Sequence, residues 1–299
     1  MRDKAEIGGV ALTHPDRVLF SGQGLTKADL AHYLFDHRAA LLAHLKNRPL
    51  SLVRCPSGEG GACFFQKHHT ASSPDEIGRV EIEESDGARE PYLVIEDAKG
   101  LVAAAQIGAL EFHIWGARAD KLEKPDRLVF DLDPGEGAAF AHVREAACDI
   151  RDALAALDLQ SFALLTGGKG VHVVVPLERR SGWAELKAFA KGFAERRAAA
   201  DPDRYVAVMA KAKRKGKIFI DWFRNTRGAT AIAPYSPRAR PGAPCAAPVS
   251  WEELSRIDKS AAFTMQAMAA RLAAQTRDPW DGYFELRQSL SARRLKAVT

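Results

Sequence analysis

The sequence predicts a mixed α/β fold of the α+β kind, and two observations support this. Short apolar runs, which have the length of strands, recur along the chain and are separated by segments rich in glycine and proline. Longer alanine-rich segments, which have the length of helices, lie between these runs. With 299 residues and a hydrophobic content of 46%, the chain can bury a sizeable core.

The amino-terminal elements follow from a helix-start signal and from apolar periodicity. Thr26 and Asp29 have the spacing of a capping pair, which predicts a helix that begins there and runs to about Lys46. Pro56 and the glycines after it predict a loop over 55–62. The ranges with strand character in this part are 50–53, 92–95 and 110–114.

The later elements alternate between apolar runs and alanine-rich segments. A glycine turn at 167–170 separates two strands, and five prolines over 234–248 predict an extended tether. The expected strands are 128–132, 162–165 and 171–175, and the expected helices are 138–157, 184–199 and 263–275.

Composition and cysteine spacing argue against several classes of protein. The chain has no run of about 18 apolar residues and no apolar signal core at its start, so we expect neither a membrane span nor a secretory signal. The four cysteines form no CxxC pair, which argues against a zinc site. These features predict a reducing, cytoplasmic location. A net charge of +5 and a pI near 9.0 suit a polyanionic partner such as nucleic acid.

Three carboxylates stand in apolar strands. Asp131 and Asp133 point to the same side of their strand because side chains alternate with a period of two, and they repel each other unless a cation lies between them. Asp221 shares a face with Phe219 in another apolar run, where a carboxylate is costly to bury unless it is paired or bound to metal. A lone Asp of this kind more often caps a turn or pairs with an arginine. Three together indicate oxygen ligands for magnesium or manganese.

The glycine turn carries a lysine and a histidine. It lies between two strands and therefore differs from the strand–turn–helix arrangement of a Walker loop. Its glycines would let the backbone approach a phosphate, and Lys169 adds a positive charge. Most glycine turns only reverse the chain, and a lone histidine such as His172 is more often structural. Beside three carboxylates, however, the turn indicates a site for phosphoryl or nucleotidyl transfer.

Two further segments carry charge or aromatic rings. Five of the seven residues in 211–217 are Lys or Arg, which indicates either a solvated hairpin tip or a phosphate-binding loop with Arg214 within reach of a nucleotide or primer. Phe64 and Phe65 stand beside Lys67, a combination typical of single-strand binders. Neighbouring residues of a strand face opposite ways, so both rings would contact DNA only from a loop or bend.

Several short motifs are spread from about Leu12 to about Leu254. They are His14-Pro15-Asp16-Arg17-Val18-Leu19-Phe20, Gly24-Leu25-Thr26-Lys27, Arg54-Cys55-Pro56-Ser57-Gly58, Phe64-Phe65-Gln66-Lys67-His68, Leu110-Glu111-Phe112-His113-Ile114-Trp115, Asp131 to Gly135, Gly167 to His172, Asp221-Trp222-Phe223-Arg224-Asn225 and Ala233-Pro234-Tyr235-Ser236-Pro237-Arg238-Ala239-Arg240. Their combination resembles the polymerase domain of bacterial DNA ligase D, a member of the archaeo-eukaryotic primase superfamily. The resemblance implies template-directed addition of ribo- or deoxyribonucleotides to DNA primer ends, with a preference for ribonucleotides, during non-homologous end joining.

The resemblance also implies roles for the matching residues. The catalytic, metal-binding carboxylates would be Asp131, Asp133 and Asp221, holding Mn²⁺ or Mg²⁺ in a two-metal site. The shell around the incoming nucleotide would comprise His113, Thr166, Gly168, Lys169, His172, Arg214, Arg224 and Arg238. The DNA-binding residues would be Arg17 and Lys27, which resemble a pair that grips a downstream 5′-phosphate, Phe64 and Phe65, which resemble a pair that packs against template bases, and Arg54 and Lys67.

The implied partners are DNA ends with 3′ overhangs or gaps and a 5′-phosphate, nucleoside triphosphates, and a DNA ligase and Ku of the same pathway at the bacterial nucleoid. We expect a single primase-polymerase-type domain over 1–299, with a catalytic sheet flanked by helices. Its DNA-end-binding amino-terminal α/β part would cover about 1–110 and pack against this sheet, its catalytic core about 111–255, and its helical closure about 256–299. No ligase domain fits within 299 residues beside it, and the sequence leaves open whether the chain stands alone or is part of a longer ligase.

Some positions depart from the pattern of the family. Thr166 replaces a usual serine and keeps the hydroxyl, Leu164 stands near a position where lysine is common, and His14 and Arg17 replace an asparagine and a lysine. Two alternatives stay open. A primase that starts chains without a primer would use the same carboxylates, and a DNA-end-binding module with weak catalysis would fit the charge lost at Leu164.

Overall fold

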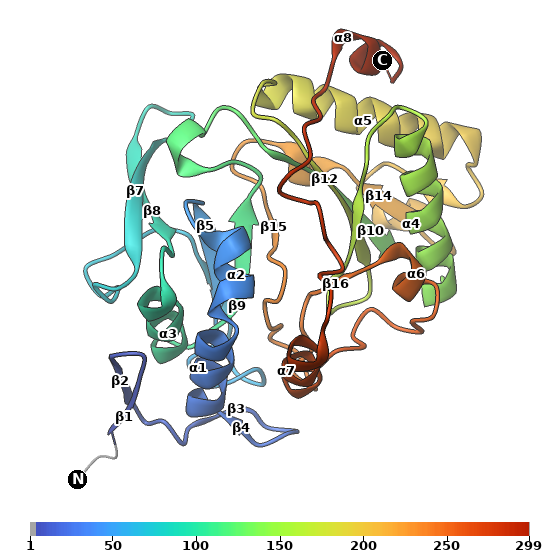
Figure 1. Cartoon of the computed structure of the whole chain (residues 1–299). Helices are drawn as coiled ribbons and strands as arrows, with labels where there is room; N and C mark the ends of the chain where they lie inside the picture. Colours follow the sequence, from blue (N-terminus) through green and yellow to red (C-terminus); the bar gives the residue numbers. More distant parts are fainter. Residues whose placement is uncertain (1–3, 299) are drawn as a thin grey trace. The chain divides into compact units, whose positions relative to one another are not determined.

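The computed structural model describes residues 4–298, and their mixed α/β structure agrees with the predicted fold class (Figure 1). The chain divides into two compact units, each made of segments that are discontinuous in sequence. Unit 1 comprises Met1–Trp115, Ile232–Ala246 and Phe263–Gln275, and unit 2 comprises Gly116–Ala231, Ala247–Ala262 and Thr276–Thr299. The expected parts were contiguous in sequence, whereas the chain returns twice to its amino-terminal unit after residue 231.

Unit 1 is built on a mostly antiparallel sheet with helices beside it (Figure 1). The strand order is β15-β9-β5-β8-β7, and β6 pairs with β5 outside this path. Leu52 and Phe112 lie opposite each other on the central strands and are fully buried. The strands are β5 (Leu50–Arg54), β6 (Phe64–Gln66), β7 (Gly78–Glu83), β8 (Arg89–Val94), β9 (Ala109–Trp115) and β15 (Thr230–Ile232), where the chain passes from unit 2 into unit 1.

The predicted amino-terminal helix begins as expected but is interrupted. The side chain of Thr26 caps α1 (Lys27–Asp36) by accepting a hydrogen bond from the N–H of Asp29. The carboxylate of Asp29 accepts one from the N–H of Thr26, which completes a capping box. The helix breaks at His37, and α2 (Arg38–Leu45) follows. At the break Arg38 donates to the carbonyl of Phe35 at 2.7 Å, so a side chain binds a carbonyl at the end of the first helix. The other elements of this unit are β1 (Lys4–Ile7), β2 (Val10–Thr13), β3 (Val18–Phe20), β4 (Leu25–Thr26), α3 (Ala98–Gln106) and α7 (Met265–Ala274).

The predicted loop over 55–62 is closed by a disulfide between Cys55 and Cys63. The cysteine pattern did not reveal this bond, because the two residues are eight positions apart and form no CxxC pair. Stable disulfides are rare in reducing compartments, so the expected reducing location implied free thiols at Cys55 and Cys63. The structure has a bond between them instead.

The prediction of an extended tether over 234–248 is wrong. The segment folds back on itself, because the N–H of Arg238 donates to the carbonyl of Pro244 and that of Ala246 to Ser236, both at 2.8 Å. Pro234 and Pro241 stand at turns, whereas Pro237 and Pro244 form isolated β-bridges. Cys245 and Ala246 are fully buried. The end of the segment enters β16 (Ala247–Val249), which pairs with β11 (Phe162–Leu165).

Unit 2 contains a six-stranded sheet in the order β13-β14-β10-β12-β11-β16. All neighbours are antiparallel except β13 and β14, and α4 and α5 pack on the sheet (Figure 1). The glycine turn joins β11 to β12, as predicted. The elements are β10 (Arg127–Pro134), α4 (Phe140–Ala155), β11 (Phe162–Leu165), β12 (Val171–Pro176), α5 (Trp183–Ala200), β13 (Tyr205–Val206), β14 (Ile218–Asp221), α6 (Trp251–Leu254) and α8 (Ala292–Lys296), with short 3-10 turns at Ala119–Lys121, Lys211–Lys213 and Phe223–Asn225.

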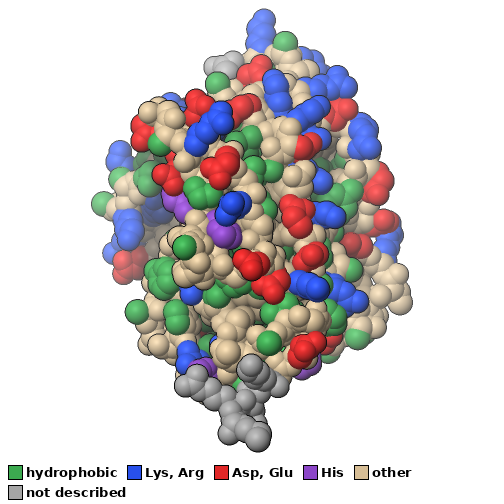
Figure 2. Space-filling view, turned by 90° about the vertical axis from the view of Figure 1, so that its left-hand side faces the viewer, with side chains coloured by type: hydrophobic (Ala, Val, Ile, Leu, Met, Phe, Trp, Pro, Cys, Tyr) green, Lys and Arg blue, Asp and Glu red, His purple; other side chains and the backbone are tan. Residues whose placement is uncertain are grey.

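Along residues 4–298, no helix combines the length and apolarity needed to cross a membrane. Acidic and basic side chains are intermingled on the face shown in Figure 2. The net positive charge of the chain is therefore not gathered into one patch on that face.

Candidate active site

Two strands of unit 2 place the three predicted carboxylates on one face of the sheet. Asp131 on β10 lies directly opposite Asp221 on β14, and Asp133 lies opposite Phe219. Residues paired in this way share a face, and so do residues two apart on one strand. His172 on β12 lies opposite Asp131 from the other side. The structure therefore brings together four of the predicted site residues, of which the strand periodicity indicated the shared face of Asp131 and Asp133.

Arg224 and His172 pair with the carboxylates. The guanidinium of Arg224 donates to Oδ2 of Asp131 at 3.1 and 3.3 Å, and its Nε lies 3.5 Å from Oδ2 of Asp221. Nε2 of His172 lies 3.3 Å from Oδ1 of Asp131. The ring of His172 is buried, and its Nδ1 has no hydrogen-bond partner among the described residues. Asp131 thus has two nitrogen partners, the guanidinium of Arg224 and the ring of His172, whereas Asp221 has only the longer contact with Arg224.

The pKa values of the carboxylates follow from this arrangement. Burial alone would raise the pKa of Asp131, but His172 and Arg224 lower it to about 2. Burial and the charge of Asp131 raise the pKa of Asp133 to about 6. Burial also raises the pKa of Asp221, against the charge of Arg224. The face therefore carries more negative charge than its own cations neutralise.

The donor chemistry of this face fits a divalent cation. Within residues 4–298, no three His, Cys, Asp or Glu side chains already converge as a metal-binding group. Hard cations prefer carboxylate oxygens, and a raised carboxylate pKa marks a place where added positive charge is favourable. Asp131, Asp133 and Asp221 are the residues that would hold the metal.

The glycine turn lies beside this face. A Cβ on Gly170 would meet the carbonyl of Leu132 at 2.5 Å and Oδ1 of Asp133 at 3.1 Å, so only glycine lets the turn approach β10 this closely. Thr166 donates to the carbonyl of Gly170 at 3.0 Å and accepts from the N–H of Gly168 at 3.3 Å. Its hydroxyl thus closes the turn, and the exposed Lys169 stands at the tip.

The basic segment 211–217 is anchored to the end of the carboxylate strand. The N–H of Gly135 donates to the carbonyl of Lys217 at 2.8 Å, and a Cβ on Gly135 would meet the carbonyl of Arg214 at 1.7 Å. The guanidinium of Arg214 stacks 3.6 Å from the ring centre of Phe219, which is the cross-strand neighbour of Asp133. These contacts hold the basic segment beside the strands that carry the carboxylates.

Two predicted nucleotide-shell residues, His113 and Arg238, form a cluster in unit 1 around Glu111. Oε2 of Glu111 lies 2.7 Å from Nε2 of His113 and 3.1 Å from Nε of Arg238. Oε1 accepts the N–H of Ala239 at 2.9 Å. Glu111 belongs to a motif that carried the family resemblance, but the sequence suggested no role for it.

Arg17 and Lys27, the predicted 5′-phosphate pair, lie together in unit 1. The backbone N–H of Lys27 donates to the carbonyl of Arg17 at 2.8 Å. The ammonium of Lys27 is buried and donates to the carbonyl of Thr13 at 2.8 Å, and burial and the charge of Arg17 lower its pKa. Arg17 is exposed and donates to the carbonyl of Pro56 at 3.1 Å. Two neighbouring cations of this kind favour an anion between them.

The other predicted DNA-binding residues surround β6. The side chains of Phe64 and Phe65 are 48% and 69% exposed although they stand in a strand, which differs from the loop or bend expected if both rings were to contact DNA. A three-residue strand that pairs only with β5 leaves both of its faces open. Arg54 stacks on Phe64 at 5.3 Å, whereas the ammonium of Lys67 donates to Glu84 at 3.2 Å and is therefore already paired.

The sequence did not reveal two residues that hydrogen-bond the backbone of the site, one on β10 and one on the glycine turn. The side-chain amide of Asn225 accepts from the N–H of Val129 at 2.8 Å and donates to its carbonyl at 2.7 Å, in the manner of a neighbouring strand. Ser260 donates to the carbonyl of Gly170 at 2.6 Å and so fixes the glycine turn. The motif around Asn225 was visible in the sequence, whereas nothing in the sequence connected Ser260 with a turn 90 residues earlier.

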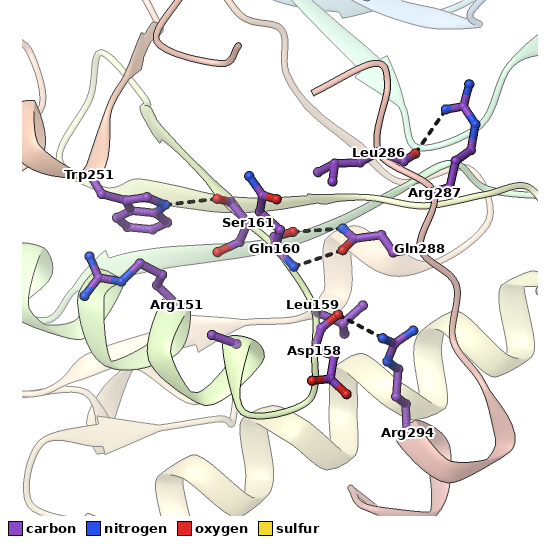
Figure 3. Close-up of a pocket in the computed structure, with 11 residues that line it drawn as sticks. Arg151, Asp158, Leu159, Gln160, Ser161, Trp251, Leu286, Arg287, Gln288 and Arg294 are labelled. Atoms are coloured by element: carbon purple, nitrogen blue, oxygen red, sulfur yellow. Dashed lines mark hydrogen bonds between the residues drawn. The ribbon is translucent and has the colours of Figure 1, made fainter. Parts of the chain in front are cut away.

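A pocket of about 550 Å³ in unit 2 lies at the amino-terminal end of β11, at the other end of that strand from Thr166 (Figure 3). Gln288 bonds both backbone groups of Gln160 there, and Arg294 donates to the carbonyl of Asp158. None of the predicted site residues lines it.

Comparisons with known proteins show which family the chain belongs to. The family model for the LigD primase-polymerase domain matches residues 26–280. The chain is 40% identical to the multifunctional non-homologous end joining protein LigD of Pseudomonas aeruginosa over 97% of this chain and 34% of that protein. It is 35% identical to the LigD of Mycolicibacterium smegmatis over 82% of this chain and 32% of that protein. The chain thus spans about a third of the length of these relatives.

The solved polymerase domain of Mycobacterium tuberculosis Ligase D in complex with DNA has a similar fold, with a TM-score of 0.84 and 32% identity. The match covers 92% of this chain and 97% of that chain. The resemblance read from the sequence motifs is therefore confirmed. The chain belongs to the LigD primase-polymerase domain family and is a nucleotidyltransferase of the primase-polymerase type.

Proposed function

We propose that this chain adds ribo- or deoxyribonucleotides to the 3′ ends of DNA primers, and that it fills gaps and overhangs during non-homologous end joining. The observation that carries the proposal is the set of three carboxylates on one sheet face, with Asp131 opposite Asp221 and the pKa of Asp133 raised to about 6. Such a face suits divalent cations, and nucleotidyl transfer from a triphosphate to a primer requires divalent cations.

A pair of Mn²⁺ or Mg²⁺ ions, when bound by Asp131, Asp133 and Asp221, would lower the pKa of the primer 3′-hydroxyl and stabilise the leaving pyrophosphate. The residues of the chain position the reactants. Lys169 at the exposed tip of the glycine turn would bind a phosphate of the triphosphate, and the backbone of the turn would approach it closely. The guanidinium of Arg224 pairs with two of the carboxylates in the absence of metal. Once the metal ions neutralise these carboxylates, it would bind the phosphates of the triphosphate instead.

The DNA contacts of the proposal lie in unit 1. The exposed rings of Phe64 and Phe65 would stack on template bases, and Arg17 with Lys27 would bind the downstream 5′-phosphate. The structural relative solved with DNA supports a nucleic-acid partner. We further propose a preference for ribonucleotides and for manganese, a cytoplasmic location at the nucleoid, and a ligase and Ku as partners, because the curated relatives are named as end-joining proteins.

A primer-extension assay tests this function. A labelled primer on a template with a 5′-phosphorylated downstream strand is incubated with each nucleotide pool and Mn²⁺ or Mg²⁺. The proposal predicts templated extension that stops when the gap is filled. Products that form without any primer would instead identify a primase. Binding of the DNA without any extension, under every metal and nucleotide condition, would identify a DNA-end-binding module.

A further inference from the structure

We propose that Glu111 is a positioning residue for nucleotide binding, which fixes the direction and tautomer of His113 and holds Arg238 beside it. The inference rests on the proposed function and deepens it. It assigns a task to a residue that contributes no group to the metal site and that lies in a different unit from the three aspartates.

The geometry makes Glu111 the centre of this cluster. Glu111 and His113 are two apart on β9 and therefore share a face. One carboxylate oxygen of Glu111 lies 2.7 Å from the His113 ring and 3.1 Å from the Arg238 guanidinium, and the other accepts the N–H of Ala239 at 2.9 Å. A single buried side chain thus ties the strand to the folded 232–246 segment that carries Arg238.

The charge of Glu111 decides the protonation of its neighbour. Burial alone would raise the pKa of Glu111, but the bond to His113, the charge of Arg238 and the N–H of Ala239 lower it to about 2. The carboxylate is therefore ionised at neutral pH and only accepts hydrogen bonds. The Nε2 atom of His113, which faces it, must carry a proton. Nδ1 is then the ring nitrogen on the side away from Glu111.

A second contact restricts the ring of His113. The exposed Phe65 lies edge-to-face against it, with ring centres 5.6 Å apart. Glu111 orients the histidine as a carboxylate orients a metal-binding histidine, and losing such a partner commonly costs about 10- to 100-fold in function. Because Phe65 belongs to the proposed template contact, Glu111 also links nucleotide binding to the aromatic pair.

Two measurements test this role. Nitrogen-15 NMR of the parent chain, with the ring signals of His113 assigned through a His113→Gln variant, reports which nitrogen carries the proton. We expect Nε2–H in the parent and a rise of Nδ1–H in Glu111→Gln, which keeps the shape of the side chain and removes its charge. Steady-state extension should show the KM for the nucleoside triphosphate raised about tenfold or more in Glu111→Gln, with kcat changed less than about threefold.

Asp126→Asn is the matched control. Asp126 is largely buried and pairs with Arg118 at 3.1 Å, so its variant also removes a carboxylate from an ion pair, but it is no part of the cluster. It should leave the KM and the His113 signals unchanged. A parent His113 protonated on Nδ1 instead of Nε2 overturns the proposal even if Glu111→Gln does not fold. So does a folded Glu111→Gln with the parental KM. A parent that shows the expected His113 signals but no extension would contradict the proposed function and leave the orienting contact in place.

Discussion

Asp131 and Asp221 face each other directly across the β10–β14 pair, and the guanidinium of Arg224 contacts both carboxylates. Two side chains that are 90 positions apart in the sequence thus form one anionic surface. Asp133 extends this surface along β10 and has no such close cationic partner among residues 4–298, which is consistent with its raised pKa. The first two predictions follow from this imbalance of charge.

The Asp133→Asn variant should be more stable than the parent at pH 7.5 in the absence of metal. The folded-state pKa of Asp133, about 6, lies above its unfolded value near 3.8, so ionisation destabilises the folded chain. This cost is fully present above pH 6 and disappears as the pH falls towards 4. We expect a gain of about 1–3 kcal/mol at pH 7.5 and none near pH 4. Urea unfolding at the two pH values checks this, and equal stabilities at pH 7.5 would contradict the charge imbalance.

Manganese should stabilise the parent against thermal unfolding but stabilise Asp133→Asn much less. A ligand that binds only the folded state raises its stability, and a lost carboxylate weakens that binding. Differential scanning fluorimetry measures the unfolding temperature of each protein with and without millimolar Mn²⁺, in a buffer that contains no other divalent cation. The shift that Mn²⁺ causes is then compared between the parent and Asp133→Asn. Glu136→Gln, at an exposed carboxylate nearby in the sequence, is the control and should respond as the parent does.

The affinity for gapped DNA should depend on a downstream 5′-phosphate. Arg17 is exposed beside the buried ammonium of Lys27, and a charge-assisted contact contributes roughly 1.5–3 kcal/mol, so the phosphate should tighten binding about tenfold at low salt. The Arg17→Gln variant should lose most of this preference and still extend a primer that has no downstream strand. The double variant Arg17→Ala with Lys27→Ala should lose the preference altogether. Equal affinity of the parent for phosphorylated and hydroxyl ends would count against the site.

Reduction of the Cys55–Cys63 bond should lower the free energy of unfolding. The bond closes a short loop with a sequence separation of 8, for which the loss of loop-closure entropy predicts about 2–3 kcal/mol. The Cys63→Ser variant, with Cys148→Ser as a control for a cysteine outside the bond, isolates the effect. Chemical unfolding with and without a dithiol reductant measures it, and a parent that is indifferent to the reductant would show that the bond contributes nothing.

Much of this structure could be read from the sequence, because strand periodicity carries local information. The shared face of Asp131 and Asp133 and the capping box at Thr26 depend on residues a few positions apart, and both are found. The folded turn of 234–246 could not be read in this way, because its proline pattern is equally typical of an extended tether. The local pairing of Pro237 with Cys245 and the long-range pairing of β16 with β11 decide between the two.

The same limit applies to the site. The identities of His113 and Arg238 were carried by motifs, but their common partner Glu111 looked like an ordinary residue of an apolar strand. Its role depends on a contact across more than 120 residues of sequence. Thr166 shows the converse, because its position was predicted while its hydroxyl is engaged in closing the glycine turn.

The extension rate of Asp221→Asn shows whether the facing carboxylates of β10 and β14 form the catalytic metal site. The variant keeps the size of the side chain and removes one carboxylate of the facing pair. With Mn²⁺, a primed template and saturating nucleotide, we expect that the parent extends the primer and that a folded Asp221→Asn loses on the order of a thousandfold or more in kcat. Extension by the folded variant at the parental rate would contradict the claim that these carboxylates form the catalytic metal site.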